Sequence, residues 1–136
     1  MKNVKHLKVL GVGDPERLGS VEFVRRFIAD MVSRVGMTPL GEPVIHDVPL
    51  SIEKLGREPF EDEGGVTGQL IGHTTLSTSH VFMFVALHTW PLQAEFKLDI
   101  YSCREFEQEP VESFIKDACR CIRLQVSDVS HAADWH

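Results

Sequence analysis

Apolar positions follow a helical spacing in two parts of the chain. Between residues 20 and 36 they recur three or four residues apart, at Val24, Phe27, Ile28, Met31 and Val35. Ser20 precedes this stripe as an N-cap, and Gly36 follows it as a natural stop. A second stripe follows Pro110, at Val111, Phe114, Ile115, Ala118, Cys119 and Ile122. The sequence therefore predicts two amphipathic helices that pack on a sheet, with Cys119 in the core and Cys121 beside the stripe.

Strand-like patterns fill most of the remaining chain. Short apolar-rich segments predict strands at 6–12, 44–48 and 124–129, and residues 65–103 hold three more, with a hydroxyl-rich turn at 77–80. Residues 94–103 alternate, so that Ala94, Phe96, Leu98 and Ile100 share one face and Cys103 ends the polar face. Polar residues 50–65 suggest a loop, and the tail from Ser130 is expected to fray.

These elements predict an α/β (α+β) fold with the order βαβββαβ. One antiparallel-rich sheet covered by two helices gives a two-layer sandwich. No repeat or low-complexity segment interrupts the pattern, and 136 residues suit one domain spanning residues 1–136.

Charge and composition narrow the class of protein. The net charge is −6 and no basic cluster occurs, which argues against nucleic acid as a partner. No apolar run approaches the roughly 20 residues of a membrane helix. Three cysteines are too few for a disulfide framework, so we expect a reducing, cytoplasmic setting.

The central block carries an ordered set of motifs. Gly-Val-Thr-Gly at 65–68 is followed by Thr-Ser-His at 78–80, His-Thr-Trp-Pro at 88–91 and an Asp-x-x-x-Cys strand end at 99–103. This order resembles the small bacterial form of the S-adenosylmethionine decarboxylases. The resemblance covers most of the chain, and the spacing of fifteen residues from His88 to Cys103 is its most specific part.

The resemblance implies a pyruvoyl-dependent decarboxylase of polyamine (spermidine) biosynthesis, acting as a homodimer. In that family a serine cuts its own chain and becomes a pyruvoyl group, which serves as the electron sink in place of an added cofactor. By motif, Ser79 is the pyruvoyl precursor, and His88 takes a proton during chain cleavage. Cys103 returns a proton to the substrate as a general acid. Thr67 and Thr78 belong to processing, and Trp90 and Phe60 to substrate binding.

The chain departs from the family pattern at four points. Thr78 stands where the family has glutamate before the serine, and Leu92 replaces the glutamate expected to hold the ribose hydroxyls. Each arm between Thr67 and His88 is about four residues longer, so an ungapped count places Thr75 at the cleavage position. A turn displaced by four residues moves by roughly 13 Å. Phe60 is only an approximate match to the adenine-stacking aromatic.

Other interpretations remain open. An uncleaved, non-catalytic relative that acts as a binding or regulatory partner fits the longer hairpin and Thr78. An unrelated α/β protein with a chance motif is a third possibility. The histidines at 73, 80 and 88 match no usual zinc spacing, so we expect no metal. The glycines form no phosphate loop and suggest bends or close backbone contacts instead.

Overall fold

The computed structural model describes residues 3–49 and 64–132, and within them one antiparallel sheet carries two main helices. The helices are α1 (Pro15–Leu18), α2 (Val21–Arg34) and α3 (Gln108–Cys119), with a 3₁₀ turn η3 (Pro91–Gln93). The strands are β1 (Asn3–Val12), β2 (Thr38–Pro39), β3 (Val44–Val48), β4 (Gly65–Leu76), β5 (Ser79–Trp90), β6 (Glu95–Ser102), β7 (Arg123–Asp128) and β8 (His131–Ala132).

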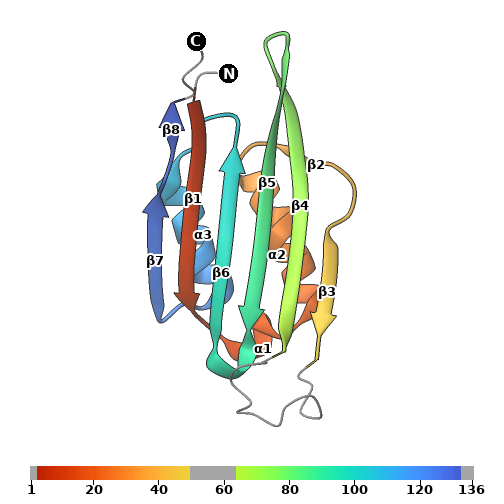
Figure 1. The fold of residues 1–136 in the computed structure, drawn as a ribbon, viewed down its shortest axis with the longest axis vertical. Coiled ribbons are helices and arrows are strands. Elements are labelled where there is room, and N and C mark those ends of the chain that lie inside the picture. The colour runs from red at the N-terminus through yellow and green to blue at the C-terminus, as the bar shows by residue number, and fades with distance from the viewer. Residues whose placement is uncertain (1–2, 50–63, 133–136) are drawn as a thin grey trace.

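The sheet runs in the order β2-β4-β5-β6-β1-β7, with β3 also paired to β4 and β8 to β1. All its pairs are antiparallel. Figure 1 shows α2 and α3 side by side behind one face of the sheet, while the other face carries no helix. The expected α+β sandwich is confirmed: β1, α2, β4, β5, β6, α3 and β7 follow the order βαβββαβ, and β3, at the predicted residues 44–48, is a further strand between the two helices.

The first predicted helix forms as its sequence indicates. The Ser20 hydroxyl accepts a hydrogen bond from the Phe23 N–H at 3.1 Å, which satisfies one of the free donors at the start of α2. Val24, Ile28 and Met31 are fully buried against the sheet. Gly36 takes a φ of 87°, which lets the chain turn away after the helix.

The second helix is shorter than its apolar stripe predicts. Val111, Ile115 and Cys119 are buried, as expected, and Cys121 is half-buried beside them. Ile122 was wrongly placed on the stripe, because it lies beyond the helix and is 86% exposed. The reason is Arg120, whose left-handed φ of 52° ends α3 and turns the chain into β7.

Three strand-level predictions also need correction. Ala94 was assigned to the apolar face of the strand predicted at 94–103, but it has a φ of 56° and ends η3 before β6 begins. The tail was expected to fray from Ser130, yet β8 pairs with Asn3 and Val4 of β1. The helical turn α1, capped by Asp14, was not predicted because four residues are too few to show a period. The predicted loop falls mainly on residues 50–63, outside the described residues.

Glycines of the 65–68 motif permit two close approaches, as the sequence suggested. A Cβ on Gly68 would lie 2.6 Å from the ends of Ile28 on α2 and Ile45 on β3. A Cβ on Gly65 would overlap the backbone oxygen of Thr89. The motif therefore brings β4 close to both α2 and β5, which fixes the position of Thr67 between the two glycines.

Thr89 ties the same region together from the buried side. It is only 3% exposed, and its hydroxyl donates to the Leu18 carbonyl at 2.7 Å while accepting from the Val66 N–H at 3.0 Å. Because this buried hydroxyl both donates and accepts a hydrogen bond, it links α1, β4 and β5 at one point. The flanking His88 and Trp90 are consequently held on the opposite face.

Asp128 closes the edge formed by β1, β7 and β8. Its carboxylate accepts from the Ser130 N–H at 2.9 Å and pairs with Lys5 at 3.0 Å. Hydrogen bonds from the Ser130 side chain and backbone, and then the Lys5 ammonium, lower the pKa of Asp128 from 3.8 to about 2. The ionised form is thus favoured by folding.

We expect Asp128→Asn to remove a pH-dependent part of the stability. Because the folded pKa lies below the unfolded one, the contribution is present above about pH 4 and is lost as the pH falls towards 2. The side chain is 40% exposed, so solvent screening holds the effect to about 1 kcal/mol or less. Urea unfolding from pH 2 to 6 measures it. Asp30→Asn, at an exposed position of α2, is the control, and equal pH profiles for both variants would contradict the assignment.

Candidate active site

A row of polar side chains crosses the face of the sheet that carries no helix, which we call the open face. The strand registers pair His46 with Thr67, Thr67 with His88, and His88 with Lys97. Directly paired residues on neighbouring strands project from the same face of a sheet. Two histidines, a hydroxyl and an ammonium therefore lie in line across β3, β4, β5 and β6.

Thr67 and His88 form the closest contact of this row. Thr67 Oγ1 lies 2.7 Å from His88 Nδ1. If His88 is to accept a proton at Nε2, its Nδ1 must carry the hydrogen and donate it to Thr67. The hydroxyl can thus set both the tautomer and the orientation of the imidazole, as a partner on the second ring nitrogen commonly does. The sequence predicted these two residues, and the structure brings them together.

Ser79 and Thr78 lie at the other end of the same hairpin. Ser77 and Thr78 form the turn, with a φ of 56° at Ser77, and Ser79 pairs with Leu76. Nine residues separate Ser79 from His88 along β5, which corresponds to about 30 Å of extended strand. Figure 1 shows this tip projecting beyond the other strands and the helices. A single chain therefore does not bring Ser79 to Thr67 and His88, and Thr75, paired with His80, is equally distant.

Cys103 lies near the hairpin tip. Its N–H donates to the Phe82 carbonyl at 2.9 Å, immediately after β6 ends, and the residue is half-buried. Since His88 is opposite Lys97, six residues before Cys103, about 20 Å of strand separates the thiol from His88. The predicted residues accordingly form two groups. The tip group contains Thr78, Ser79 and Cys103, although alternation places Ser79 on the helix-covered face and Cys103 on the open face. The base group contains Thr67, His88 and Trp90.

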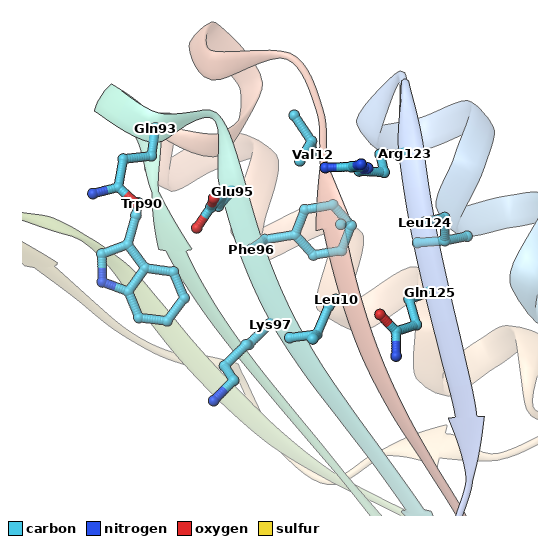
Figure 2. Close-up of a pocket in the computed structure, with 11 residues that line it drawn as sticks. Leu10, Val12, Trp90, Gln93, Glu95, Phe96, Lys97, Arg123, Leu124 and Gln125 are labelled. Atoms are coloured by element: carbon cyan, nitrogen blue, oxygen red, sulfur yellow. The ribbon is translucent and has the colours of Figure 1, made fainter.

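Trp90 borders a pocket of about 720 Å³ on the open face beside the base group. Figure 2 shows its polar lining: Gln93 and Glu95 follow Trp90, Lys97 extends from β6, and Arg123 and Gln125 come from β7. The ring of Phe96 packs over Gly11 beneath it. The pocket thus joins an indole to charges of both signs, next to the row that contains His88.

The positions expected to recognise an adenosyl group are less well matched. Leu92 lies in η3, is 70% exposed and does not line the pocket. It therefore offers no acceptor for ribose hydroxyls. Phe60, the candidate for stacking on adenine, lies outside the described residues.

The other two cysteines do not belong to this site. A hydrogen bond with Cys121, followed by burial, raises the pKa of the Cys119 thiol far above its usual range. The same contact lowers the pKa of Cys121. Cys119 is the last residue of α3 and is buried in the core, so Cys103 is the thiol nearest to the other predicted site residues.

Two absences hold for the residues that the structure describes. No group of three or more His, Cys, Asp or Glu side chains among them is arranged to hold a metal ion. No helix in these two ranges is long and apolar enough to cross a membrane.

Sequence reasoning missed His46 and Lys97 as neighbours of the Thr67 and His88 pair. Lys97 was assigned to a polar strand face, but its partner depends on the register between β5 and β6. His46 comes from a strand that pairs across a long connection. The alternation pattern predicts that Lys97 lies on the polar face of its strand, but no local pattern predicts which residue of β5 lies opposite it.

Comparisons with known proteins agree with the motifs. A family model described as S-adenosylmethionine decarboxylase matches residues 7–131. The crystal structure of the adenosylmethionine decarboxylase from Aquifex aeolicus VF5 superposes with a TM-score of 0.58 at 17% identity, covering 96% of this chain and 88% of that one. At this identity the superposition shows a shared fold. A search of curated proteins finds no match. Since the family model spans most of the sequence, the chain belongs to the S-adenosylmethionine decarboxylase family.

Proposed function

We propose that this chain is a self-processing, pyruvoyl-dependent decarboxylase that acts on S-adenosylmethionine or a related amino acid in polyamine biosynthesis. The observation that carries the proposal is the 2.7 Å contact between Thr67 and His88, two residues with processing roles in the motif. Family membership supports the same chemistry. The three free cysteines fit a reducing cytoplasm as the place where the enzyme works.

The tip of the hairpin suits chain cleavage in two respects. Residues 75–80 are exposed, and the bend at Ser77 presents the peptide bond between Thr78 and Ser79 away from the rest of the sheet. A pyruvoyl group derived from Ser79 would supply an electron sink for decarboxylation. One chain alone does not form the complete site for this group, because Ser79 and Cys103 lie towards the tip while the His88 imidazole lies about 30 Å from Ser79.

Each remaining residue then has a defined task. His88, held by Thr67 in the tautomer with a free Nε2, accepts the proton released when the chain is cut. Cys103 donates a proton to the substrate carbon after carbon dioxide leaves. Lys97 is paired with His88 across β5 and β6, which places an ammonium group beside the imidazole.

A homodimer would complete the site. If two chains pack about a two-fold axis that crosses β5 midway between Ser79 and His88, the hairpin tip of each chain lies beside the base group of its partner. Ser79 shares its face of β5 with the buried Met83 and Val85, so the serine would approach that base group from the end of the hairpin. That midpoint falls beside Phe84, whose partner on β4, Ile71, is 43% exposed, and the next open-face residue of β5, Phe82, is 46% exposed. Apolar side chains of this size are favoured at the centre of an interface. The distance between Ser79 and His88 prevents their contact within one chain, and a two-fold dimer would bring the two residues of different chains closer.

The pocket beside Trp90 is the proposed place for the substrate. Trp90 offers a flat apolar surface, Glu95 an acceptor for an ammonium group, and Lys97 and Arg123 donors for a carboxylate. This set suits an amino acid with an apolar or aromatic portion. Leu92 cannot accept hydrogen bonds from the ribose hydroxyls. We therefore expect this chain to bind S-adenosylmethionine more weakly than a variant with glutamate at position 92.

Exposed Leu92 and the long hairpin also favour a second function. An uncleaved relative without decarboxylase activity would keep the open face as a binding surface for a partner subunit. The two functions differ in the covalent state of the purified chain, since only the enzyme is cut in two.

The first test is the intact mass of the purified protein. We expect two fragments that meet at Thr78 and Ser79, the second blocked by a pyruvoyl group, and we expect Ser79→Ala to stay whole. Ser77→Ala, in the same turn, is the matched control and should be cut. A single species near 15.3 kDa for the native chain would favour the uncleaved function, and a break before Thr75 would move the cleavage site.

Co-expression of two inactive variants tests the shared site. Ser79→Ala keeps His88 but lacks the serine, and His88→Ala has the reverse defect, so neither alone should be cut. In a mixed dimer the serine of one chain meets the imidazole of the other, and the His88→Ala chain should be cleaved. Mass spectrometry distinguishes the two chains. Failure to rescue, with mixed dimers shown to form, would exclude the shared arrangement.

Restoring a carboxylate tests the account of substrate recognition. We expect Leu92→Glu to bind S-adenosylmethionine roughly tenfold more tightly, since a hydrogen bond to a charged group contributes about 1.5–3 kcal/mol. Leu92→Gln separates charge from hydrogen bonding, and Leu40→Glu, at another exposed leucine, is the control. Calorimetric titration provides the affinities, and no gain for Leu92→Glu would rule out this role for position 92.

A further inference from the structure

Two histidines face each other near the hairpin tip, away from the Thr67 and His88 pair. His73 lies on β4 opposite Phe82, and His80 lies on β5 opposite Thr75, so the two are diagonal neighbours. Both follow the alternation of the open face, which also carries Thr67 and His88. His80 and His88 are eight residues apart on β5, about 26 Å of strand. The tip histidines therefore form a separate cluster.

The two rings are already arranged as a pair. His73 Nδ1 lies 2.8 Å from His80 Nε2, and the rings are nearly parallel, with an interplanar angle of 8° and centroids 5.1 Å apart. Phe82 lies against His80 at a centroid distance of 5.2 Å, which limits the rotation of that ring. As a hydrogen bond, the contact requires one nitrogen to carry a proton and the other to present a lone pair.

We propose that His73 and His80 bind a divalent transition-metal ion between the two arms of the hairpin. Imidazole nitrogens bind zinc at 2.0–2.1 Å, so two such ligands on one ion lie about 2.9–3.4 Å apart for bond angles of roughly 90–109°. The observed 2.8 Å is close to the lower end of that range. To bind one ion, the rings must turn so that Nδ1 of His73 and Nε2 of His80 both point at it; because Phe82 packs against His80, the His73 ring takes the larger part of this movement.

The donor set selects the class of ion. Two neutral imidazoles suit Zn²⁺, Ni²⁺ and Cu²⁺, whereas Mg²⁺ and Ca²⁺ prefer several oxygen ligands. No third His, Cys, Asp or Glu joins the pair among the described residues, so water completes the coordination. Such a site is weaker than a four-ligand zinc centre. Spacing along the chain gave no sign of it, because the register of β4 and β5 is what brings the histidines together.

A bound ion would cross-link β4 to β5 close to the turn. The tip at residues 75–80 is exposed, and Figure 1 shows that no helix supports it. Binding to the folded hairpin alone raises the stability of the folded state in proportion to the logarithm of the ion concentration. The site does not depend on chain cleavage or on decarboxylase activity.

The test is a Zn²⁺ titration of the untagged, full-length protein by calorimetry. We expect one ion per chain, at least tenfold weaker binding in His73→Ala and in His80→Ala, and no binding of Mg²⁺. His46→Ala, another exposed open-face histidine, is the matched control and should bind like the parent. Because both ligand nitrogens must be unprotonated, protons compete with the ion, and lowering the pH should weaken the binding of Zn²⁺.

Other outcomes overturn the proposal. Absence of Zn²⁺ binding in the parent, or equal binding in both tip variants, shows that His73 and His80 are not ligands. Loss of binding in His46→Ala places the ion elsewhere on the open face. Circular dichroism of each variant establishes that the sheet is retained, and His73→Gln with His80→Gln gives a second pair that keeps polar side chains of similar size.

Discussion

The register of the hairpin formed by β4 and β5 is the constraint on which the rest of the structure depends. Val66 and Leu70 on β4 and Val85 and Leu87 on β5 are buried against the helices. A slip of one residue would expose all four and bury their neighbours, including His88. The core therefore holds Thr67 opposite His88, and the contact between them follows from packing on the far side of the sheet.

The same hairpin determines what one chain can do alone. Its arms extend without a bulge from Thr67 and His88 to Leu76 and Ser79, so every added residue moves the tip along the strand by about 3.3 Å. A rigid antiparallel ladder does not fold back on itself. The groups at its two ends do not meet within one chain, so the proposed processing requires a contact between molecules.

Local sequence patterns predicted the main helices and strands, but they did not predict where some of these elements end or which strand residues lie opposite each other. The Ser20 cap and the periodic stripe placed α2, because both depend on neighbours within one or two turns. Ile122 was misplaced because the period continues past Arg120, while the backbone does not. Ala94 failed in the same way, since alternation cannot reveal a left-handed residue. The motif predicted Thr67 and His88 as site residues. Their position beside His46 and Lys97 depends on how β3 pairs with β4 and β5 with β6, which no local pattern indicates.

One face of the sheet forms the hydrophobic core, and the other carries the candidate site. One face is covered by α2 and α3, and Gly68 lets β4 pack closely against α2. The other combines the polar row with Phe82, Ile71 and Leu10, each between 43% and 46% exposed. Apolar side chains gathered around polar ones on an uncovered face are typical of a surface that meets a partner or a ligand. Leu92 is 70% exposed in η3, so a different residue at this position does not disturb the buried core that maintains the family fold.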